Sequence, residues 1–119
     1  MKSYIKQSNP FVVPTTDGKI IEEHHGLAST GNPNFSVARM VAPPNWIEPF
    51  QTPTFDEITM LISGKKMIEI DGEQIILNPG ESLLVKKGAR VRYSNPYDEP
   101  AEYWSVCIPA FSIDLVNRE

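Results

Sequence analysis

Several kinds of residue are scarce in this sequence, and each scarcity narrows the range of functions. Cys107 is the single cysteine among 119 residues, so no disulfide framework can form and we expect a reducing, cytoplasmic location. Positive charge is in deficit: the net charge is −4, and the pairs Lys65-Lys66 and Lys86-Lys87 flank turns, where we expect solvated lysines. This balance argues against a nucleic-acid partner, which would need a basic face.

Long apolar runs are also missing. No stretch approaches the length of a membrane span, and residues 1–4 lead into polar sequence rather than into the apolar core of a signal peptide. We therefore expect no membrane partner. With 40% hydrophobic and 22% charged residues the composition is that of an ordinary globular protein, and 119 residues suffice for one domain.

Eleven prolines and seven glycines interrupt the chain at short intervals, which leaves little room for a long helix. The turn Asp71-Gly72 between two apolar runs is typical of a two-residue hairpin. We expect strands over residues 19–25, 35–41, 57–63, 67–70, 73–77, 82–85, 91–94 and 102–108. Short strands at this spacing indicate an all-β sandwich or barrel.

The other segments are less regular. Residues 1–14 are mixed and predict an arm or an edge strand, residues 46–54 predict an extended loop or an irregular strand, and residues from 111 onward predict a short helix or a tail. Residues 57–63 are almost continuously apolar, as in a strand covered on both faces.

One set of spacings is more specific than this general pattern. Glu57 is followed by Gly64, and Pro79-Gly80 is followed by Gly88 and then by Asn95. These spacings resemble the two sequence motifs of the cupin superfamily. The resemblance implies an all-β, jelly-roll-like, double-stranded β-helix barrel with a central pocket, formed as a single domain by residues 1–119 with residues 35–111 as the barrel core.

The metal ligands of that family are mostly replaced. The histidine places of the first motif fall on Gln51 and Pro53, or on Phe50 and Thr52 with the longer gap, and that of the second motif falls on Val91. Transition metals favour imidazole and thiolate ligands. We therefore expect no cofactor; a divalent transition metal, if bound, would use Glu57 and Gln51, with an extra ligand from Glu48 or from a histidine.

Longer segments of the sequence resemble two particular groups within this superfamily. Gln51 to Glu57, Val91 to Ser94 and Val106 to Ser112 are similar to small single-domain bacterial cupins, a group without an agreed activity. Asp56-Glu57-Ile58 and Pro109-Ala110 also resemble the ethanolamine-utilisation cupins, which are associated with acetate kinase activity.

Strand alternation predicts which side chains share the pocket. With Glu57 inward, Thr59, Leu61 and Ser63 follow it, and Ile58, Met60 and Ile62 take the opposite face. With Val91 inward, Tyr93 and Asn95 follow it, and Arg90 and Arg92 face outward, where they could bind an anion at the rim or be solvated. The predicted ligand-binding residues are Gln51, Trp46, Trp104 and Asn95, with Glu57 and Tyr93 as candidate catalytic groups.

Two functional classes follow. In the first, the chain binds a small molecule without chemistry, which the loss of the histidines favours. In the second, it is a metal-independent enzyme of isomerase or acetate-kinase-like type, in which Glu57, desolvated beside aromatic surface, acts as general acid or base. A metal-dependent enzyme ranks third.

Three further features have plainer interpretations. His24 and His25 are adjacent on a strand and point to opposite faces, which favours surface or packing roles. Cys107 lies in an apolar strand and is interpreted as a small buried hydrophobe. The apolar face of Ile58, Met60 and Ile62 predicts a homodimer, and the family resemblance implies that the dimer exchanges its N-terminal arms.

Overall fold

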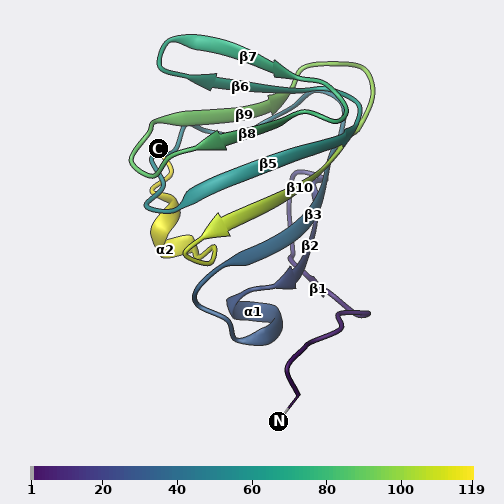
Figure 1. Cartoon of the computed structure of the whole chain (residues 1–119). Coiled ribbons are helices and arrows are strands. Elements are labelled where there is room, and N and C mark those ends of the chain that lie inside the picture. The colour runs from purple at the N-terminus through teal and green to yellow at the C-terminus, as the bar shows by residue number, and fades with distance from the viewer. Residues whose placement is uncertain (1) are drawn as a thin grey trace.

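The computed structural model describes residues 2–119; Met1, the first residue of the predicted arm, lies outside the described residues. The chain is mostly β-strand, as predicted, with two helices of four residues each (Figure 1). The elements are β1 (Phe11–Val12), β2 (Ile20–His25), α1 (Leu27–Thr30), β3 (Ser36–Ala42), β4 (Trp46–Ile47), β5 (Asp56–Ser63), β6 (Lys66–Ile70), β7 (Glu73–Leu77), β8 (Ser82–Val85), β9 (Val91–Asn95), β10 (Ala101–Ile108) and α2 (Ile113–Val116).

The strands form two antiparallel sheets. The six-stranded sheet has the order β1-β2-β3-β10-β5-β8, and the four-stranded sheet has the order β4-β9-β6-β7. The core cluster takes buried side chains from both sheets, among them Leu61 and Tyr103 from the first and Ile68 and Val91 from the second. This is the double-sheet arrangement of a jelly-roll barrel, which confirms the predicted fold class.

Local sequence accounts for most element boundaries. The hairpin of β6 and β7 turns at Asp71 and Gly72, whose φ angles of 54° and 74° both lie in the left-handed region that a tight two-residue turn requires. The eight predicted strands are all present, with ends displaced by at most one residue. Residues 1–14 contain β1 at the edge of the six-stranded sheet. The single turn α1 was not predicted, because four residues carry no helical periodicity.

Gly64 allows the chain to pass from one sheet to the other. It lies between β5 and β6 with a φ of 78°, and a Cβ atom there would lie 2.3 Å from the carbonyl oxygen of Pro100. Both the backbone conformation and the close contact require glycine. The motif glycine therefore fixes the corner that brings β6 over the inner face of β5.

Alternation along β5 follows the prediction except at the strand end. Thr59 and Leu61 are buried, whereas Met60 and Ile62 are 40% and 51% exposed, and Ser63 is exposed beside a register shift between β5 and β10. The expectation that this strand is covered on both faces is therefore wrong for the single chain. Its second face is apolar and open to solvent.

Candidate functional site

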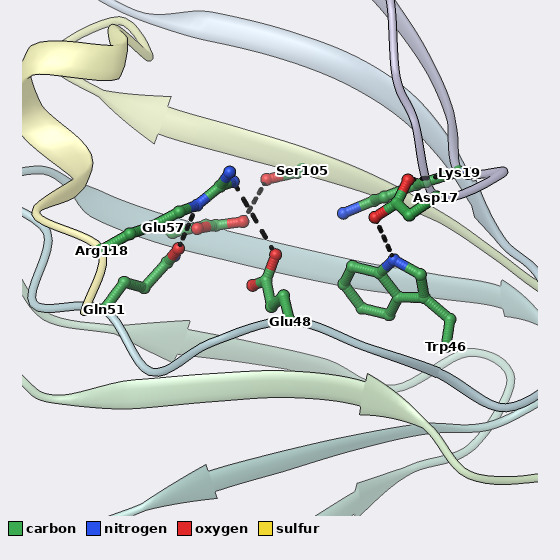
Figure 2. Close-up of polar contacts among 8 residues, drawn as sticks. All are labelled: Asp17, Lys19, Trp46, Glu48, Gln51, Glu57, Ser105 and Arg118. Atoms are coloured by element: carbon green, nitrogen blue, oxygen red, sulfur yellow. Dashed lines mark hydrogen bonds and ion pairs between the residues drawn. The ribbon is translucent and has the colours of Figure 1, made fainter.

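A cavity of about 520 Å³ lies between the two sheets. Its walls are largely apolar, and it is rimmed by residues 13–19 near the N-terminus and by Ile113 and Arg118 near the C-terminus. Polar side chains from distant segments point into it (Figure 2). They include Asp17, Lys19, Glu48, Gln51, Glu57, Lys66, Tyr93, Ser105 and Arg118.

Glu57 and Ser105 form a hydrogen-bonded pair on the six-stranded sheet. β5 and β10 are neighbours, with Ser105 opposite Thr59 and Cys107 opposite Glu57, so both side chains face inward. The Ser105 hydroxyl donates to Glu57 Oε2 over 2.6 Å. The remaining lone pairs of this carboxylate are available to a bound molecule.

Lys66 projects into the cavity from the facing sheet. It is only 2% exposed, and its Nζ lies 3.5 Å from the ring centroid of Tyr103 and 4.3 Å from that of Tyr93. Within residues 2–119 it forms no ion pair. Burial, and then the neighbouring charge of Lys19, lower the pKa of Lys66 to about 7, and the attraction of Glu57 and Glu48 compensates only in part.

The position of Lys66 corrects the expectation that the pair Lys65-Lys66 is solvated. β6 begins at Lys66. Lys66 and Ile68 are both buried, so these alternate residues of the strand face inward. Lys65 precedes the strand and is exposed. One lysine of the pair is therefore at the surface and the other lies in the cavity.

Lys19 supplies a second ammonium group. Its Nζ lies 4.3 Å from the Trp46 ring and 5.6 Å from the ring of Tyr103, so both lysines contact the same tyrosine. Burial alone would lower the pKa of Lys19, but the combined attraction of Tyr103, Glu48 and Glu57 outweighs burial and raises it. Lys19 is therefore charged at neutral pH, whereas Lys66 is charged in only part of the molecules.

Glu48, Gln51 and Arg118 meet near the mouth of the cavity (Figure 2). Arg118 Nη2 lies 3.8 Å from Glu48 Oε2, and Arg118 Nε donates to Gln51 Oε1 over 3.4 Å. Burial raises the pKa of Glu48, because its desolvation outweighs the nearby positive charges of Lys19, Lys66 and Arg118. Glu48 is therefore protonated in a larger fraction of molecules than an exposed glutamate, as a general acid must be.

Of the six predicted site residues, the structure brings four to the cavity: Trp46, Gln51, Glu57 and Tyr93. Gln51 and Val91, two of the family's histidine places, exchange backbone hydrogen bonds of 2.9 and 2.8 Å. The Tyr93 hydroxyl is buried without a hydrogen-bond partner among the described residues. Burial raises the pKa of Tyr93 far above its ordinary value, so this phenol is a donor rather than a base.

Trp104 and Asn95 lie elsewhere, contrary to the prediction. The inward residues of β10 include Tyr103 and Ser105, so Trp104 faces outward, with its ring 4.8 Å from that of His24. Asn95 is fully buried, and its Nδ2 donates to three backbone carbonyls, those of Ala42, Pro43 and Glu99. It joins loops rather than contacting the cavity.

The other polar residues of the sequence analysis also have defined places. Arg90 and Arg92 face away from the cavity as predicted, and they pair with Glu119 and Glu69 respectively. Cys107 is buried as expected, and desolvation raises the pKa of its thiol.

The side chains of the cavity do not fit a tightly bound transition metal. In residues 2–119 no three histidine, cysteine, aspartate or glutamate side chains lie close enough to hold a metal ion. Gln51, the substitute for a histidine, already accepts a hydrogen bond from Arg118. An amide and one carboxylate are a weak set for such metals.

The family model for the cupin domain matches residues 38–109, well over half of the sequence. The chain belongs to the cupin family. This cupin also shares its fold with solved structures of low sequence identity. The EutQ ethanolamine-utilisation protein of Salmonella typhimurium has a TM-score of 0.67 and 19% identity, over 78% of this chain and 71% of that one. The polyketide cyclase RemF of Streptomyces resistomycificus has a TM-score of 0.72 and 11% identity, over 91% and 80%.

One curated relative is closer in sequence. A Myxococcus xanthus protein described as endoribonuclease YbeY is 44% identical over 108 residues, which make up 91% of this chain and 37% of that protein. The cupin thus spans little more than a third of its relative's length. In the part of the chain that the structure describes, no helix is long and apolar enough to cross a membrane.

Proposed function

We propose that this cupin binds a small polar molecule, a hydroxy acid or oxo acid, in the cavity between its sheets. The cavity volume of about 520 Å³ is that of a metabolite site. The observation that carries the proposal is Lys66, a buried amine that faces the cavity and forms no ion pair within residues 2–119. Buried polar groups are normally satisfied, so a ligand oxygen is a natural partner.

The surrounding groups define the chemical class. Lys19, Lys66 and Arg118 offer donors to an acid group, whereas Glu57 offers acceptors to a hydroxyl group. The unpartnered hydroxyl of Tyr93 offers a further donor. Trp46 and Phe55 supply apolar wall for a carbon skeleton. The ligand therefore carries both a carboxylate and a neutral oxygen.

Isothermal titration with lactate, malate, pyruvate and 2-oxoglutarate tests the proposal. We expect one of these acids to bind, and Lys66→Met to weaken that binding by about 10- to 100-fold, because a charge-assisted hydrogen bond contributes about 1.5–3 kcal/mol. Lys65→Met is the matched control, since Lys65 is the exposed neighbour. Equal affinity of the wild type and Lys66→Met would contradict the proposal, as would a complete lack of binding.

A second candidate function is metal-independent proton transfer. The Glu57–Ser105 pair and Lys66, with its pKa near 7, lie on opposite walls of one cavity, and such groups suit general acid–base catalysis. Exchange of the hydrogen next to the carbonyl of an oxo acid in D₂O, followed by NMR, would detect it. Loss of exchange in Glu57→Gln with binding retained would support catalysis; unchanged exchange would exclude Glu57 as the base. The likeness to EutQ is one of fold alone and carries no reaction to this chain.

A further inference from the structure

Lys66 has the surroundings of a nucleophilic amine rather than of a simple anion-binding lysine. It is buried against the rings of Tyr93 and Tyr103, and the ammonium of Lys19 lies 5.6 Å from the centroid of the same Tyr103 ring. Desolvation and a neighbouring cation are the two devices by which proteins keep a lysine unprotonated and reactive. Both act on Lys66.

The one thiol of the cavity is less suited to attack. Cys107 also lines the cavity, but burial raises the pKa of its thiol, so little thiolate forms at neutral pH. Two serines line the cavity: Ser105 donates a hydrogen bond to Glu57, and Ser36 accepts one from the backbone N–H of Phe111. Within residues 2–119 no histidine lines the cavity to act as the base of either serine. The amine of Lys66 is therefore the strongest nucleophile that the cavity presents.

We propose that Lys66 forms a reversible imine with the carbonyl carbon of a small oxo acid or aldehyde bound in the cavity. For an oxo acid this rests on the proposed function, in which Lys19 and Arg118 hold the carboxylate. The hydroxy acids of the proposed class bind in the same place without reacting, because they offer no carbonyl carbon.

The reaction balances with the groups present. The lone pair of the neutral Lys66 amine forms a bond to the carbonyl carbon, and the carbonyl oxygen takes up a proton to become a hydroxyl. The nitrogen gives up a proton, a second proton reaches the hydroxyl, and water leaves as the carbon–nitrogen double bond forms. The iminium nitrogen then gives up its remaining proton to leave the neutral imine. One amine and one carbonyl yield one imine and one water, with no oxidant or reductant. Glu48, whose pKa burial raises, and Glu57 are the carboxyls of the cavity that can transfer these protons.

Reductive trapping tests this step on the unmodified chain. The protein is incubated with pyruvate, and in parallel with glycolaldehyde, in the presence of cyanoborohydride, and the modified lysines are located by peptide mass spectrometry. We expect the amount of adduct at Lys66 to exceed that at Lys65 by roughly 10-fold or more. The reactive form is the free amine, and a larger fraction of Lys66 is in that form. Exposure alone predicts the opposite order, since Lys65 is exposed and Lys66 is buried. This comparison within one molecule needs no variant to fold.

The outcomes separate this inference from the proposed function. Adduct at Lys66 that malate suppresses supports both. Adduct distributed over the exposed lysines, with Lys66 unmodified, would overturn the imine, while titration of lactate or malate still decides whether the cavity binds acids. Adduct at Lys66 without any binding of lactate or malate would support the imine and overturn the proposed acid site. Lys66→Arg, which keeps a cation but cannot form an imine, should lose the adduct and retain part of the affinity for malate.

Discussion

The two faces of the six-stranded sheet differ in a way that reverses the usual pattern of an exposed sheet. On the face toward the barrel interior, Glu23, Thr59 and Ser105 are buried, and Glu57 lines the cavity beside them. On the face toward solvent, apolar side chains are substantially exposed. They are Met60, Ile62, Leu84 and Ile108. Polar groups inside and apolar groups outside each carry a cost in a monomer without ligand.

From this difference we expect the sheet to serve two binding events. The inner face carries polar side chains among its apolar ones because we expect it to bind a small molecule, and the outer face carries exposed apolar side chains because we expect it to bind a second copy of the chain. The outer apolar side chains are clustered by strand pairing: Ile58 lies opposite Leu84 on one side and Val106 on the other, and Met60 lies opposite Trp104. Beside this cluster, Arg39 of β3 forms ion pairs with Glu22 of β2 and with Glu102 near the start of β10. The expected homodimer therefore involves β10, β5 and β8.

The largest effect should come from making the interior as apolar as the exterior. The double variant Lys66→Met/Glu57→Leu should lose acid binding by roughly 100-fold or more, because charge-assisted bonds from both walls are removed. The same variant should be more stable by about 1–4 kcal/mol, since apolar residues of similar volume avoid the desolvation of buried charges. Titration calorimetry and urea denaturation measure the two quantities. A variant that binds as the wild type does would show that these walls are structural.

The converse change makes the exterior polar. We expect Met60→Glu with Leu84→Glu to weaken the homodimer by about 100-fold, because four carboxylates would be brought into one apolar interface. Sedimentation velocity over a dilution series gives the dissociation constant. The control is Glu22→Gln on β2, which lies outside the three strands of the expected interface and should leave the mass unchanged. A wild-type chain that is monomeric at micromolar concentration would contradict the homodimer.

The pH dependence of stability should distinguish the interior charges. The pKa of Lys66 is about 7 in the folded chain against an ordinary value of 10.5, so between these pH values the unfolded chain binds the extra proton. The free energy of unfolding should therefore rise with pH from about 7, by up to about 1.4 kcal/mol per unit. Below pH 7 both states hold the proton and the penalty of burying it is complete.

Comparison with Lys66→Met isolates the contribution of Lys66 to the pH dependence of the free energy of unfolding. The rise between pH 7 and pH 9 should be absent from the variant, and subtraction of the two curves removes the groups that face Lys66 in both proteins. Those groups are Lys19, Glu48, Glu57, Tyr93, Tyr103 and Cys107. Identical pH profiles for the two chains would show that Lys66 titrates as an exposed lysine.

The smallest effect should be that of metal removal. With Gln51 and Glu57 as the available ligands, we expect less than about 0.1 transition metal ion per chain by elemental analysis, and a melting temperature that chelator changes by less than about 1 °C. Protein purified without chelator and without an affinity tag is the sample to use. A near-stoichiometric metal would show that ligands beyond these two reach the cavity.

Sequence patterns predicted the features that local rules control. The strands, the Asp71-Gly72 hairpin and the inward parity of Glu57 and Tyr93 depend on neighbours close in sequence, and each was found. One of the two misplaced site residues, Trp104, was also accessible to the same rule. Trp104 has the opposite parity to Cys107, which was predicted to be buried, so alternation already placed this tryptophan on the outer face.

The three cationic side chains of the cavity were not predicted from the sequence. Their positions depend either on where a strand begins, to within one residue, or on packing between segments distant in sequence. The predicted strand begins at residue 67, which leaves Lys66 in the turn, whereas β6 begins at Lys66 itself. This difference of one residue decides whether the Lys66 side chain is solvated or faces the cavity. Lys19 and Arg118 reach the cavity from segments near the two ends of the chain. Tertiary contacts determine how these segments pack on the barrel. Examples are the hydrogen bonds from Trp46 to Asp17 and from Arg118 to Gln51. The periodicity of a local sequence pattern does not predict such contacts.

The two tryptophans of the chain lie on opposite sides of the six-stranded sheet. Trp46 lines the cavity beneath the Lys19 ammonium, and Trp104 lies on the outer face against His24. Their fluorescence should therefore respond to different events. In Trp104→Phe the emission comes from the cavity alone, and in Trp46→Phe it comes from the outer face alone. We therefore expect Trp46 to report occupancy of the cavity and Trp104 to report assembly of the expected homodimer, and both signals can be followed without a label.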